Sequence, residues 1–464
     1  MPGFSVENFG CRAARADGEA VSERLRAAGL PEDSPSMANV LVVNTCSVTA
    51  EADRSARAFI RRAHRLNPTA KIVVTGCYAQ RAPQELAAMA GVSAVVGNSH
   101  KALAPEIILS LALAGQPAER LELVPVGSIL AGGAPIWADD RFAHSFLEEA
   151  QLAPGSQTRP NLKIQEGCGN RCTFCVIPQT RGSSKSLFAA SVLKQVTGFV
   201  AAGGNELVLS GINLGRWGRD LAIEAGQTRL TFAALVRRIL DSTGLPRLRF
   251  SSIEPMDWDA DLVALMAEFG GTRLARHAHL PLQSGSDAVL RRMHRRYRPW
   301  HYVEKVNALL RAAGPDLTLG ADVMVGFPGE TDAEFEETVA LIESLPFGYL
   351  HLFPFSPRPG TRAWTLNAER PVPGPVVDER MAVLRVLAAR KTSAHRKGFV
   401  GREVEALTLH TSEALARRGL TAAMTENFLP VELEGGIEPN RLVRVHVTGM
   451  NPDGSLRATC PTPA

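Results

Sequence analysis

Long apolar segments are absent from this chain of 464 residues. The longest apolar run, at Ile107–Ala114, is far shorter than the roughly 18–20 residues that a membrane-spanning helix requires, so we expect no such helix. Residues 1–9 also lack a basic stretch followed by an apolar one, which is the pattern of a secretory signal. The sequence therefore predicts a cytoplasmic protein without a membrane-spanning segment.

A large excess of charge of one sign is absent too. The chain has 51 lysines and arginines against 47 aspartates and glutamates, a net charge of +4, so a polyanionic partner must be held by local basic patches. Hydrophobic residues make up 45% and charged residues 21%, which excludes a mainly disordered chain. A chain of this length is expected to form about two to four domains.

Residues 1–115 alternate between strand and helix signals, which predicts a parallel, Rossmann-like α/β domain. The expected strands are 40–44, 71–75 and 92–96, and the expected helices are 50–66 and 83–90. Between residues 116 and 160 the periodicity fails and glycine and proline recur, so this segment is predicted to be a connector.

Residues 161–397 contain six further strand signals separated by helical stretches, which predicts a partial (β/α)6 barrel of the TIM type. The expected strands are 162–166, 206–210, 248–252, 275–280, 320–325 and 349–354, and the expected last helix is 376–397. Catalytic groups would then lie at the carboxyl ends of the strands. Residues 398–464 change to short alternating runs with turn signals, so we expect a small all-β, OB-like barrel there.

Cysteines are few, and seven of them, an odd number, favour metal or redox chemistry over a disulfide framework. Cys168, Cys172 and Cys175 form a C-x3-C-x2-C array directly after the first expected barrel strand. A structural zinc site needs four nitrogen or sulfur ligands, and no other cysteine lies within 80 residues on either side. Three thiolates are enough for a 4Fe–4S cluster whose fourth iron is left open to a chelating ligand.

Three dispersed cysteines, Cys11, Cys46 and Cys77, each follow an expected strand of the first domain. Because the carboxyl ends of parallel strands lie along one edge of a sheet, these cysteines can converge there. A buried, inert thiol is the alternative for any one of them taken alone. The three together predict a second cluster with one open iron, whereas Cys460 belongs to neither set.

The central array, with Phe174 before its third cysteine, resembles the radical S-adenosylmethionine superfamily. Nearly the whole chain is similar to the methylthiotransferase family within it, whose enzymes are transferases of sulfur-containing groups. The similar segments are 44–47, 75–80, the cysteine array, 279–286, 325–331 and 425–428, the last of which resembles a TRAM domain. The resemblance implies two 4Fe–4S clusters, held by Cys11, Cys46 and Cys77 and by Cys168, Cys172 and Cys175.

The resemblance also implies the reaction. S-adenosyl-L-methionine would chelate the open iron of the central cluster and be split to a 5′-deoxyadenosyl radical, while the N-terminal cluster would carry the sulfur that is methylated and transferred. The chain would need an electron donor and a sulfur source as partners. The residues expected to bind S-adenosylmethionine are Gly203, Gly204, Glu206, Ser252 and Gln283. For the two glycines, the alternative is a helix C-cap followed by a strand.

Between Cys46 and Gln80 the chain looks most like the branch of the family that acts on C2 of N6-threonylcarbamoyladenosine, next to the anticodon in tRNA. The anticodon stem-loop would be held largely through its phosphates. Basic residues on the helix after Cys46 and in a basic, aromatic stretch at 291–300 are the expected contacts, with a solvated helix surface as the alternative. These residues are Arg54, Arg57, Arg61, Arg291, Arg292, Arg295 and Arg296.

Two features depart from the family pattern. Ala14 stands where the family usually has asparagine, and residues 398–464 carry six arginines against eight acidic residues, a net charge of −2. Other functions stay open at this point. They are methylthiolation of a ribosomal-protein aspartate, methylthiolation of isopentenyladenosine in tRNA, and a non-catalytic iron–sulfur protein that binds RNA.

Overall fold

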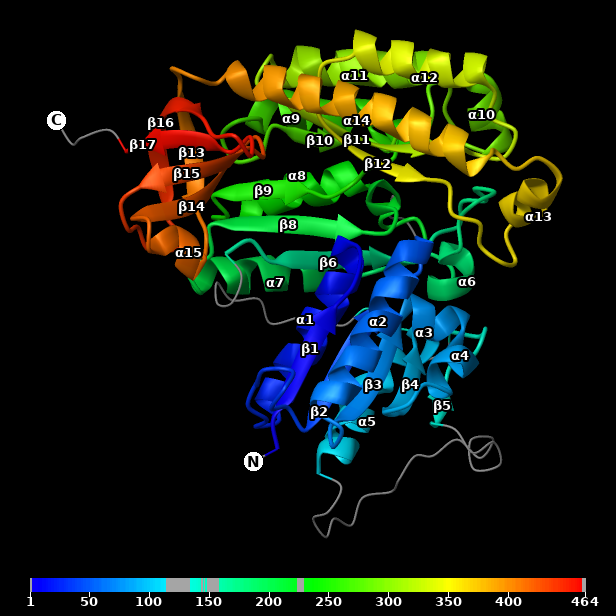
Figure 1. Cartoon of the computed structure of the whole chain (residues 1–464). Helices are drawn as coiled ribbons and strands as arrows, with labels where there is room; N and C mark the ends of the chain where they lie inside the picture. The colour runs from blue at the N-terminus through cyan, green and yellow to red at the C-terminus, as the bar shows by residue number, and fades with distance from the viewer. Residues whose placement is uncertain are drawn as a thin grey trace. The chain divides into compact units, whose positions relative to one another are not determined.

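The computed structural model describes residues 2–113, 134–142, 145, 147, 158–222 and 229–460 (Figure 1). The chain divides into two compact units. The first contains residues 1–150, 165–170 and 175–185, and the second contains residues 151–164, 171–174 and 186–464. Within the described ranges, every helix is too short or too polar to cross a membrane.

The first unit is built on a parallel sheet of five strands in the order β1-β2-β3-β4-β5. The strands are β1 (Phe4–Asn8), β2 (Val40–Thr45), β3 (Lys71–Gly76), β4 (Val92–Gly97) and β5 (Ile136–Trp137). The helices are α1 (Arg12–Ala27), α2 (Ala50–Leu66), α3 (Cys77–Arg81), α4 (Pro83–Ala87) and α5 (Ala104–Ala112), with a 3-10 helix η1 (Asn98–Leu103) before α5. Successive valines of β2 enter opposite cores, as expected for a strand covered on both faces.

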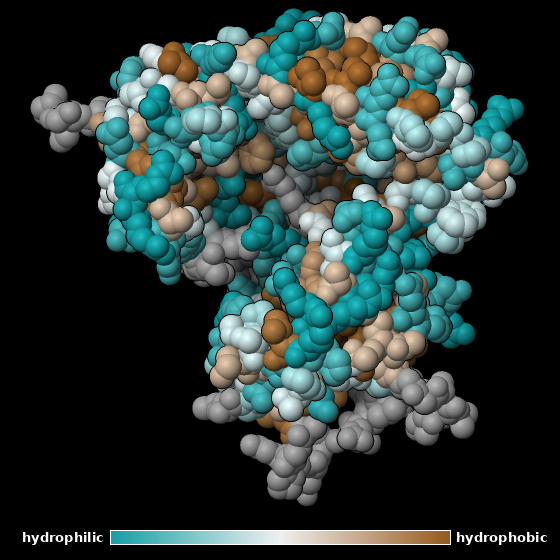
Figure 2. Space-filling view, viewed as in Figure 1, coloured by the Kyte–Doolittle hydropathy of each residue, from teal (hydrophilic) through white to brown (hydrophobic). Residues whose placement is uncertain are grey.

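Helix α2 begins where its sequence predicts, because the side chain of Thr49 accepts a hydrogen bond from the Ala52 amide at 3.2 Å and caps the helix. One face of α2 is buried and the opposite face is rich in exposed arginine. Figure 2 shows this face as a band of hydrophilic side chains over the helix.

The prediction that residues 116–160 form a connector without regular structure is partly wrong. Residues 134–142 are ordered, and β5 extends the first sheet by pairing with β4, Val95 opposite Ile136. A strand of two residues is too short for periodicity to reveal. Residues 116–133, 143–144, 146 and 148–157 of that segment lie outside the described residues.

The second unit contains the predicted partial barrel, and the α/β fold class is confirmed. Its parallel strands are β6 (Asn161–Glu166), β8 (Glu206–Gly211), β9 (Arg247–Phe250), β10 (His277–His279), β11 (Thr318–Val325) and β12 (Phe347–Pro354). They form a four-stranded sheet, β7-β6-β8-β9 with β7 at Lys185–Ser186, and a three-stranded sheet, β10-β11-β12. Its helices are α7 (Ala189–Ala201), α8 (Phe232–Ser242), α9 (Ala260–Phe269), α10 (Asp287–Arg292), α11 (Pro299–Ala313), α12 (Asp332–Ser344), α13 (Arg362–Glu369) and α14 (Gly374–Lys397), whereas α6 (Ile177–Arg181) belongs to the first unit.

A closed all-β barrel follows α14, in the strand order β13-β14-β15-β17-β16. The strands are β13 (Glu403–Thr408), β14 (Leu420–Thr425), β15 (Pro430–Glu434), β16 (Leu442–Met450) and β17 (Leu456–Thr459), with a short helix α15 (Glu413–Ala416). The short alternating runs of the sequence, at 403–409, 429–433 and 442–447, correspond to β13, β15 and β16, whereas β14 and β17 were not expected. The barrel encloses one apolar core that includes Val431, Leu433 and Val445.

Candidate functional site: two cysteine triads

The first cysteine triad lies at the carboxyl edge of the N-terminal sheet. Cys11 follows β1 and precedes α1, Cys46 directly follows β2, and Cys77 directly follows β3 as the first residue of α3. A Cβ atom added to Gly10, whose φ is +111°, would lie 2.2 Å from the Cβ of Cys46. Only glycine permits this close approach, so the backbone before Cys11 is shaped around the neighbouring cysteine.

The thiols of this first triad influence one another. A hydrogen bond between Cys46 and Cys11, with a further contribution from the charge of Arg181, lowers the pKa of Cys11 to about 5 against the effect of burial. The same contact raises the pKa of Cys46. The Asn98 side-chain amide donates to the Cys77 sulfur at 3.4 Å, and Arg181 Nε donates to it at 3.2 Å. The surroundings therefore favour the thiolate form of Cys11.

Arg181 is a functional residue that the sequence analysis did not identify. It is fully buried in the first unit, and it donates to Asp17 Oδ2 at 2.9 Å and to Glu166. Lys101 also pairs with both carboxylates. Burial lowers the pKa of Arg181, but the charges of Cys77 and Asp17 raise it above its ordinary value, so the guanidinium stays charged beside the cysteine.

The residues around the first triad fit an iron–sulfur cluster. They supply three thiols at one edge of the sheet. Arg181 and the Asn98 amide both donate to the Cys77 sulfur, and Gly10 leaves room beside Cys46. These are the ligand type and the hydrogen bonding that cluster sites use. Ala14, at the position that departs from the family pattern, is buried, and its carbonyl accepts a hydrogen bond from Asn44 at 2.5 Å.

The second cysteine triad lies on the loop that follows β6. Cys168, Cys172 and Cys175 are all half-buried, whereas Cys46 and Cys77 are buried. The amide of Cys168 donates to the Gly182 carbonyl at 3.1 Å, and the Asn170 amide donates to the Cys168 sulfur at 3.4 Å. Its three thiols meet the ligand requirement of a cluster with an open iron.

The placement of Arg295 corrects the expectation that it contacts RNA. It is buried, and its Nη1 donates to the Cys172 sulfur at 3.4 Å. Its Nη2 reaches both carboxylate oxygens of Glu254, at 2.8 and 2.6 Å, and its guanidinium lies over the ring of Tyr297. A guanidinium engaged on every side in this way is not available to a phosphate, so Arg295 belongs to the cysteine site.

Unsatisfied polar atoms mark the carboxyl ends of the barrel strands. Ser210 Oγ in β8, Ser251 Oγ after β9 and Gln283 Oε1 beside β11 are buried without a hydrogen-bond partner among the residues that the structure describes. Ser252, half-buried, lies next to Ser251. Because buried polar groups are normally paired, these atoms fit a bound polar cofactor such as S-adenosylmethionine.

Gly203, Gly204 and Glu206 lie at the amino end of β8, away from these atoms, which contradicts their expected role in binding the cofactor. Gly203, with φ +82°, terminates α7, and a Cβ on Gly204 would meet the ring of Phe199. Glu206 is fully buried and pairs with three arginines. These are Arg249 at 2.7 Å, Arg247 at 3.2 Å and Arg159 at 3.4 Å. The motif is therefore a helix C-cap followed by a structural ion cluster.

The remaining expected RNA contacts differ in their availability. Arg292 reaches Glu334 at 2.8 and 2.7 Å and the Gly329 carbonyl at 3.2 Å, which makes it a structural clamp. Arg57 is held by Tyr78 and Glu85. The other four are exposed, although three of them also pair with a carboxylate. Arg291 of α10 pairs with Asp287 at 2.8 Å, Arg296 pairs with Asp257 at 3.5 Å, and on α2 Arg54 pairs with Glu51. Arg61 is exposed on α2. These four exposed arginines remain candidates.

Comparison with known proteins places this arrangement in a family. The profile of the radical SAM superfamily matches residues 162–342, and that of the uncharacterized protein family UPF0004 matches residues 3–97. The threonylcarbamoyladenosine tRNA methylthiotransferase MtaB of Aquifex aeolicus (strain VF5) is 35% identical over 95% of this chain and 99% of its own length. The chain belongs to the radical SAM methylthiotransferase family. It is thus a radical SAM enzyme of the methylthiotransferase class.

Relatives from another branch of the methylthiotransferase family are similar to a comparable degree. The tRNA-2-methylthio-N(6)-dimethylallyladenosine synthase of Erythrobacter litoralis (strain HTCC2594) is 33% identical over 97% of this chain and 95% of its own length. Among solved structures, the radical S-adenosylmethionine methyltransferase TsrM from Kitasatospora setae matches with a TM-score of 0.55 and 16% identity. The match covers 81% of this chain and 80% of that one, and it supports the fold alone.

Proposed function

We propose that this enzyme transfers a methylthio group to C2 of N6-threonylcarbamoyladenosine next to the anticodon of tRNA. Two 4Fe–4S clusters would be held by three cysteines each, the first by Cys11, Cys46 and Cys77 and the second by Cys168, Cys172 and Cys175. S-adenosylmethionine is the second cofactor, and an electron donor and a sulfur source complete the reaction. A cytoplasmic location is part of the proposal, because tRNA is modified there.

The observation that carries this proposal is the first triad. Three cysteines that follow three consecutive strands lie at one edge of the sheet, and Arg181 donates to one of them, in addition to the array that defines the superfamily. A radical enzyme that only cleaves S-adenosylmethionine needs a single triad, whereas insertion of sulfur requires a second sulfur-binding centre. The name MtaB among full-length relatives supports the choice of threonylcarbamoyladenosine.

The roles of the protein's own residues follow from their positions. When bound, the clusters and S-adenosylmethionine supply the electron, the radical and the sulfur that an unactivated aromatic C–H bond requires. Arg181 and Arg295 each keep a positive charge next to one cysteine sulfur. Ser251 and Gln283 offer hydrogen-bonding atoms to S-adenosylmethionine. The exposed arginines 291 and 296 offer contacts for phosphates.

The experiment that tests the substrate is mass spectrometry of nucleosides from the tRNA of a strain that lacks this gene. We expect N6-threonylcarbamoyladenosine to accumulate without its 2-methylthio form, and expression of the gene to restore that form. A strain expressing the variant with alanine at Cys168, Cys172 and Cys175 is the matched control and should not restore it. Loss of 2-methylthio-dimethylallyladenosine instead, or loss of a methylthio group from a ribosomal protein with unchanged tRNA, would overturn the proposal.

A further inference from the structure

The inner face of the second sheet of the barrel carries a row of polar and aromatic side chains. Adjacent strands pair Gly320 with Tyr349 and Asp322 with His351, while His279 pairs with Gly320. A Cβ on Gly348 would meet His395 of α14, so residue 348 faces that helix. Because side chains alternate along a strand, Tyr349 and His351 project to the opposite face, inside the barrel.

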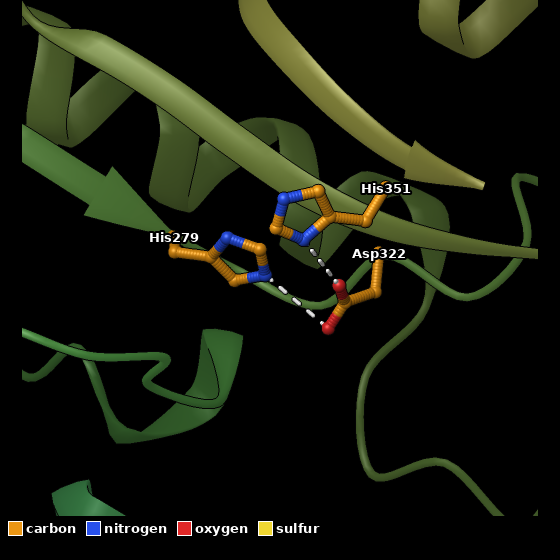
Figure 3. Close-up of side chains that lie close together, drawn as sticks. All are labelled: His279, Asp322 and His351. Carbon is orange, nitrogen blue, oxygen red and sulfur yellow. Dashed lines mark hydrogen bonds and ion pairs between the residues drawn. The ribbon is translucent and has the colours of Figure 1, made fainter. Parts of the chain in front are cut away.

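Three of these side chains converge on one point. His279 Nε2 lies 3.2 Å from Asp322 Oδ2, and His351 Nδ1 lies 3.3 Å from Asp322 Oδ1. All three potential ligand atoms lie within 4.8 Å of one another. Figure 3 shows the two imidazole rings and the carboxylate pointing toward a common centre from three neighbouring strands. Metal–ligand bonds of about 2.0–2.2 Å place neighbouring ligand atoms about 3.0–3.4 Å apart. The two distances between a histidine nitrogen and a carboxylate oxygen lie in this range, each to a different oxygen of Asp322.

The orientation of His279 is fixed by a second layer of contacts. Its Nδ1 lies 2.9 Å from the hydroxyl of Tyr349, which also lies 2.7 Å from Nε2 of His277. Gly320 makes this possible, because a Cβ there would lie 2.1 Å from the Tyr349 ring. A histidine that ligates a metal usually donates its other ring N–H to such a partner. The arrangement leaves Nε2 of His279 directed at Asp322.

Asp322 carries the negative charge that a cation needs. Burial raises its pKa, but hydrogen bonds from His279 and His351 hold the pKa below its ordinary value, so the group is a carboxylate near neutral pH. The three side chains differ in exposure, at 9% for His279, 27% for Asp322 and 63% for His351. One side of the group is therefore anchored in the barrel and the other side reaches solvent.

We propose that His279, Asp322 and His351 bind one divalent transition-metal ion, of the class of zinc, manganese or ferrous iron. Two histidines and one carboxylate are a common ligand set for these ions when coordination positions are left open. Tyr349 and His351 also line a pocket of about 290 Å³ with Arg396 and Phe428, so the side of the group that His351 forms adjoins open space. This site uses none of the six cysteines and does not depend on the nucleoside proposed as substrate.

The test is a manganese titration of the full-length protein with its clusters loaded and kept in the oxidised, diamagnetic state. The protein is first passed over a chelating resin, and free aqueous Mn²⁺ is then followed by its paramagnetic resonance signal. The variants are Asp322→Asn, His351→Gln and Tyr349→Phe, and His446→Gln, exposed on β16, is the control. Because His351 is exposed, its replacement leaves the core intact.

We expect the wild type and His446→Gln to bind one Mn²⁺ per chain that Zn²⁺ displaces. Asp322→Asn and His351→Gln should lose this equivalent, and Tyr349→Phe should weaken it about 10–100-fold, as loss of a group that orients a ligand does. Iron content and circular dichroism equal to those of the wild type will show that each variant is folded. Absence of Mn²⁺ binding by the wild type, or equal binding by His351→Gln, would overturn the proposal and leave the group as an ion pair.

Discussion

Both cysteine triads have a buried arginine beside one sulfur, but the carboxylates that hold this arginine differ. In each, a buried arginine lies beside one sulfur, Arg181 at 3.2 Å from Cys77 and Arg295 at 3.4 Å from Cys172. Arg181 is held by Asp17 and Glu166 with Lys101 nearby, whereas Arg295 is held by a single carboxylate.

The exposure of the cysteines differs between the triads as well. In the first triad Cys46 and Cys77 are buried and Cys11 is exposed, whereas all three cysteines of the second triad are half-buried. Both triads supply three thiols, so the surroundings of the cysteines, and not their number, distinguish the two sites.

The largest effect is expected from removing either triad. Anaerobically reconstituted wild type should bind about eight irons per chain, because two four-iron clusters are assigned to six cysteines. Alanine at Cys11, Cys46 and Cys77, or at Cys168, Cys172 and Cys175, should leave about four. Iron and sulfide analysis measures this, and Cys460→Ala is the control that should keep all eight. Full iron content in either triple variant would show that the cysteine assignment is wrong.

Replacing Arg181 and Arg295 tests the role of the arginine that lies beside one sulfur in each triad. Arg181→Met and Arg295→Met should each lower the free energy of unfolding, by up to about 3–5 kcal/mol, because Glu166 and Asp17 in the first case and the half-buried Glu254 in the second lose a cationic partner. Urea unfolding of the loaded protein measures this loss. Each change should also lower the reduction potential of the neighbouring cluster, because a cation that favours the reduced form is gone.

The surroundings of the two arginines predict different rescues. Adding Glu254→Gln to Arg295→Met removes the carboxylate with which Arg295 pairs and should restore most of the stability. Adding Glu166→Gln to Arg181→Met should restore less, because Asp17 still lacks its ion pair with Arg181. Equal recovery of stability in the two double variants would contradict the proposed difference between the surroundings of Arg295 and Arg181.

The buried arginines also show which features the sequence alone does not predict. Helix α2 and most barrel strands could be predicted to within about two residues, because a cap and apolar alternation are local signals. Arg295 was interpreted as an RNA contact since it lies in a basic stretch. Its carboxylate partner, Glu254, is 41 residues away, and only the tertiary fold brings the two together.

The expected site residues also divide into those that local signals could place and those that only the tertiary fold places. Convergence of the first cysteine triad could be predicted, because parallel strands end at one edge. Glu206 was wrongly assigned to the cofactor site, because a glycine pair next to a strand signal does not show at which end of the barrel the pair lies. The group formed by His279, Asp322 and His351 was not identified, since its members come from three separate strands.

Glu206 provides a prediction with a pH dependence. Burial raises its pKa, but Arg249, Arg159 and Arg247 lower it to about 2, below its ordinary value of 4.5. The carboxylate therefore stabilises the fold fully above about pH 4.5, and this stabilisation is lost as the pH falls toward 2. Glu206→Gln should lower the free energy of unfolding at pH 7 by about 3 kcal/mol. Thermal unfolding measures this loss.

The same variant separates structure from cofactor binding. Glu206→Gln should leave the affinity for S-adenosylmethionine unchanged in the folded protein, whereas Gln283→Ala should weaken it, because only Gln283 lies at the carboxyl side of the strands. Equilibrium dialysis of the loaded protein measures both. Weaker binding by Glu206→Gln alone would restore its expected role in holding the cofactor.

The smallest effect is expected at the exposed arginines. Arg291→Ala with Arg296→Ala should weaken tRNA binding and reduce the slope of log affinity against log salt by about 0.7–0.9 for each phosphate that is no longer neutralised. Fluorescence anisotropy at several salt concentrations measures the slope. Arg237→Ala, which removes an exposed arginine paired with Glu268 on the surface, is the matched control and should leave the slope unchanged.

The central claim is that the two triads perform different parts of one reaction, and the variant with alanine at Cys11, Cys46 and Cys77 tests it most directly. The variant is incubated with strong reductant, S-adenosylmethionine and tRNA, and 5′-deoxyadenosine and methylthiolated nucleoside are measured together. We predict that 5′-deoxyadenosine forms and that no methylthiolated nucleoside appears, while the variant lacking Cys168, Cys172 and Cys175 forms neither. Methylthiolated nucleoside from the variant without the first triad would contradict the account.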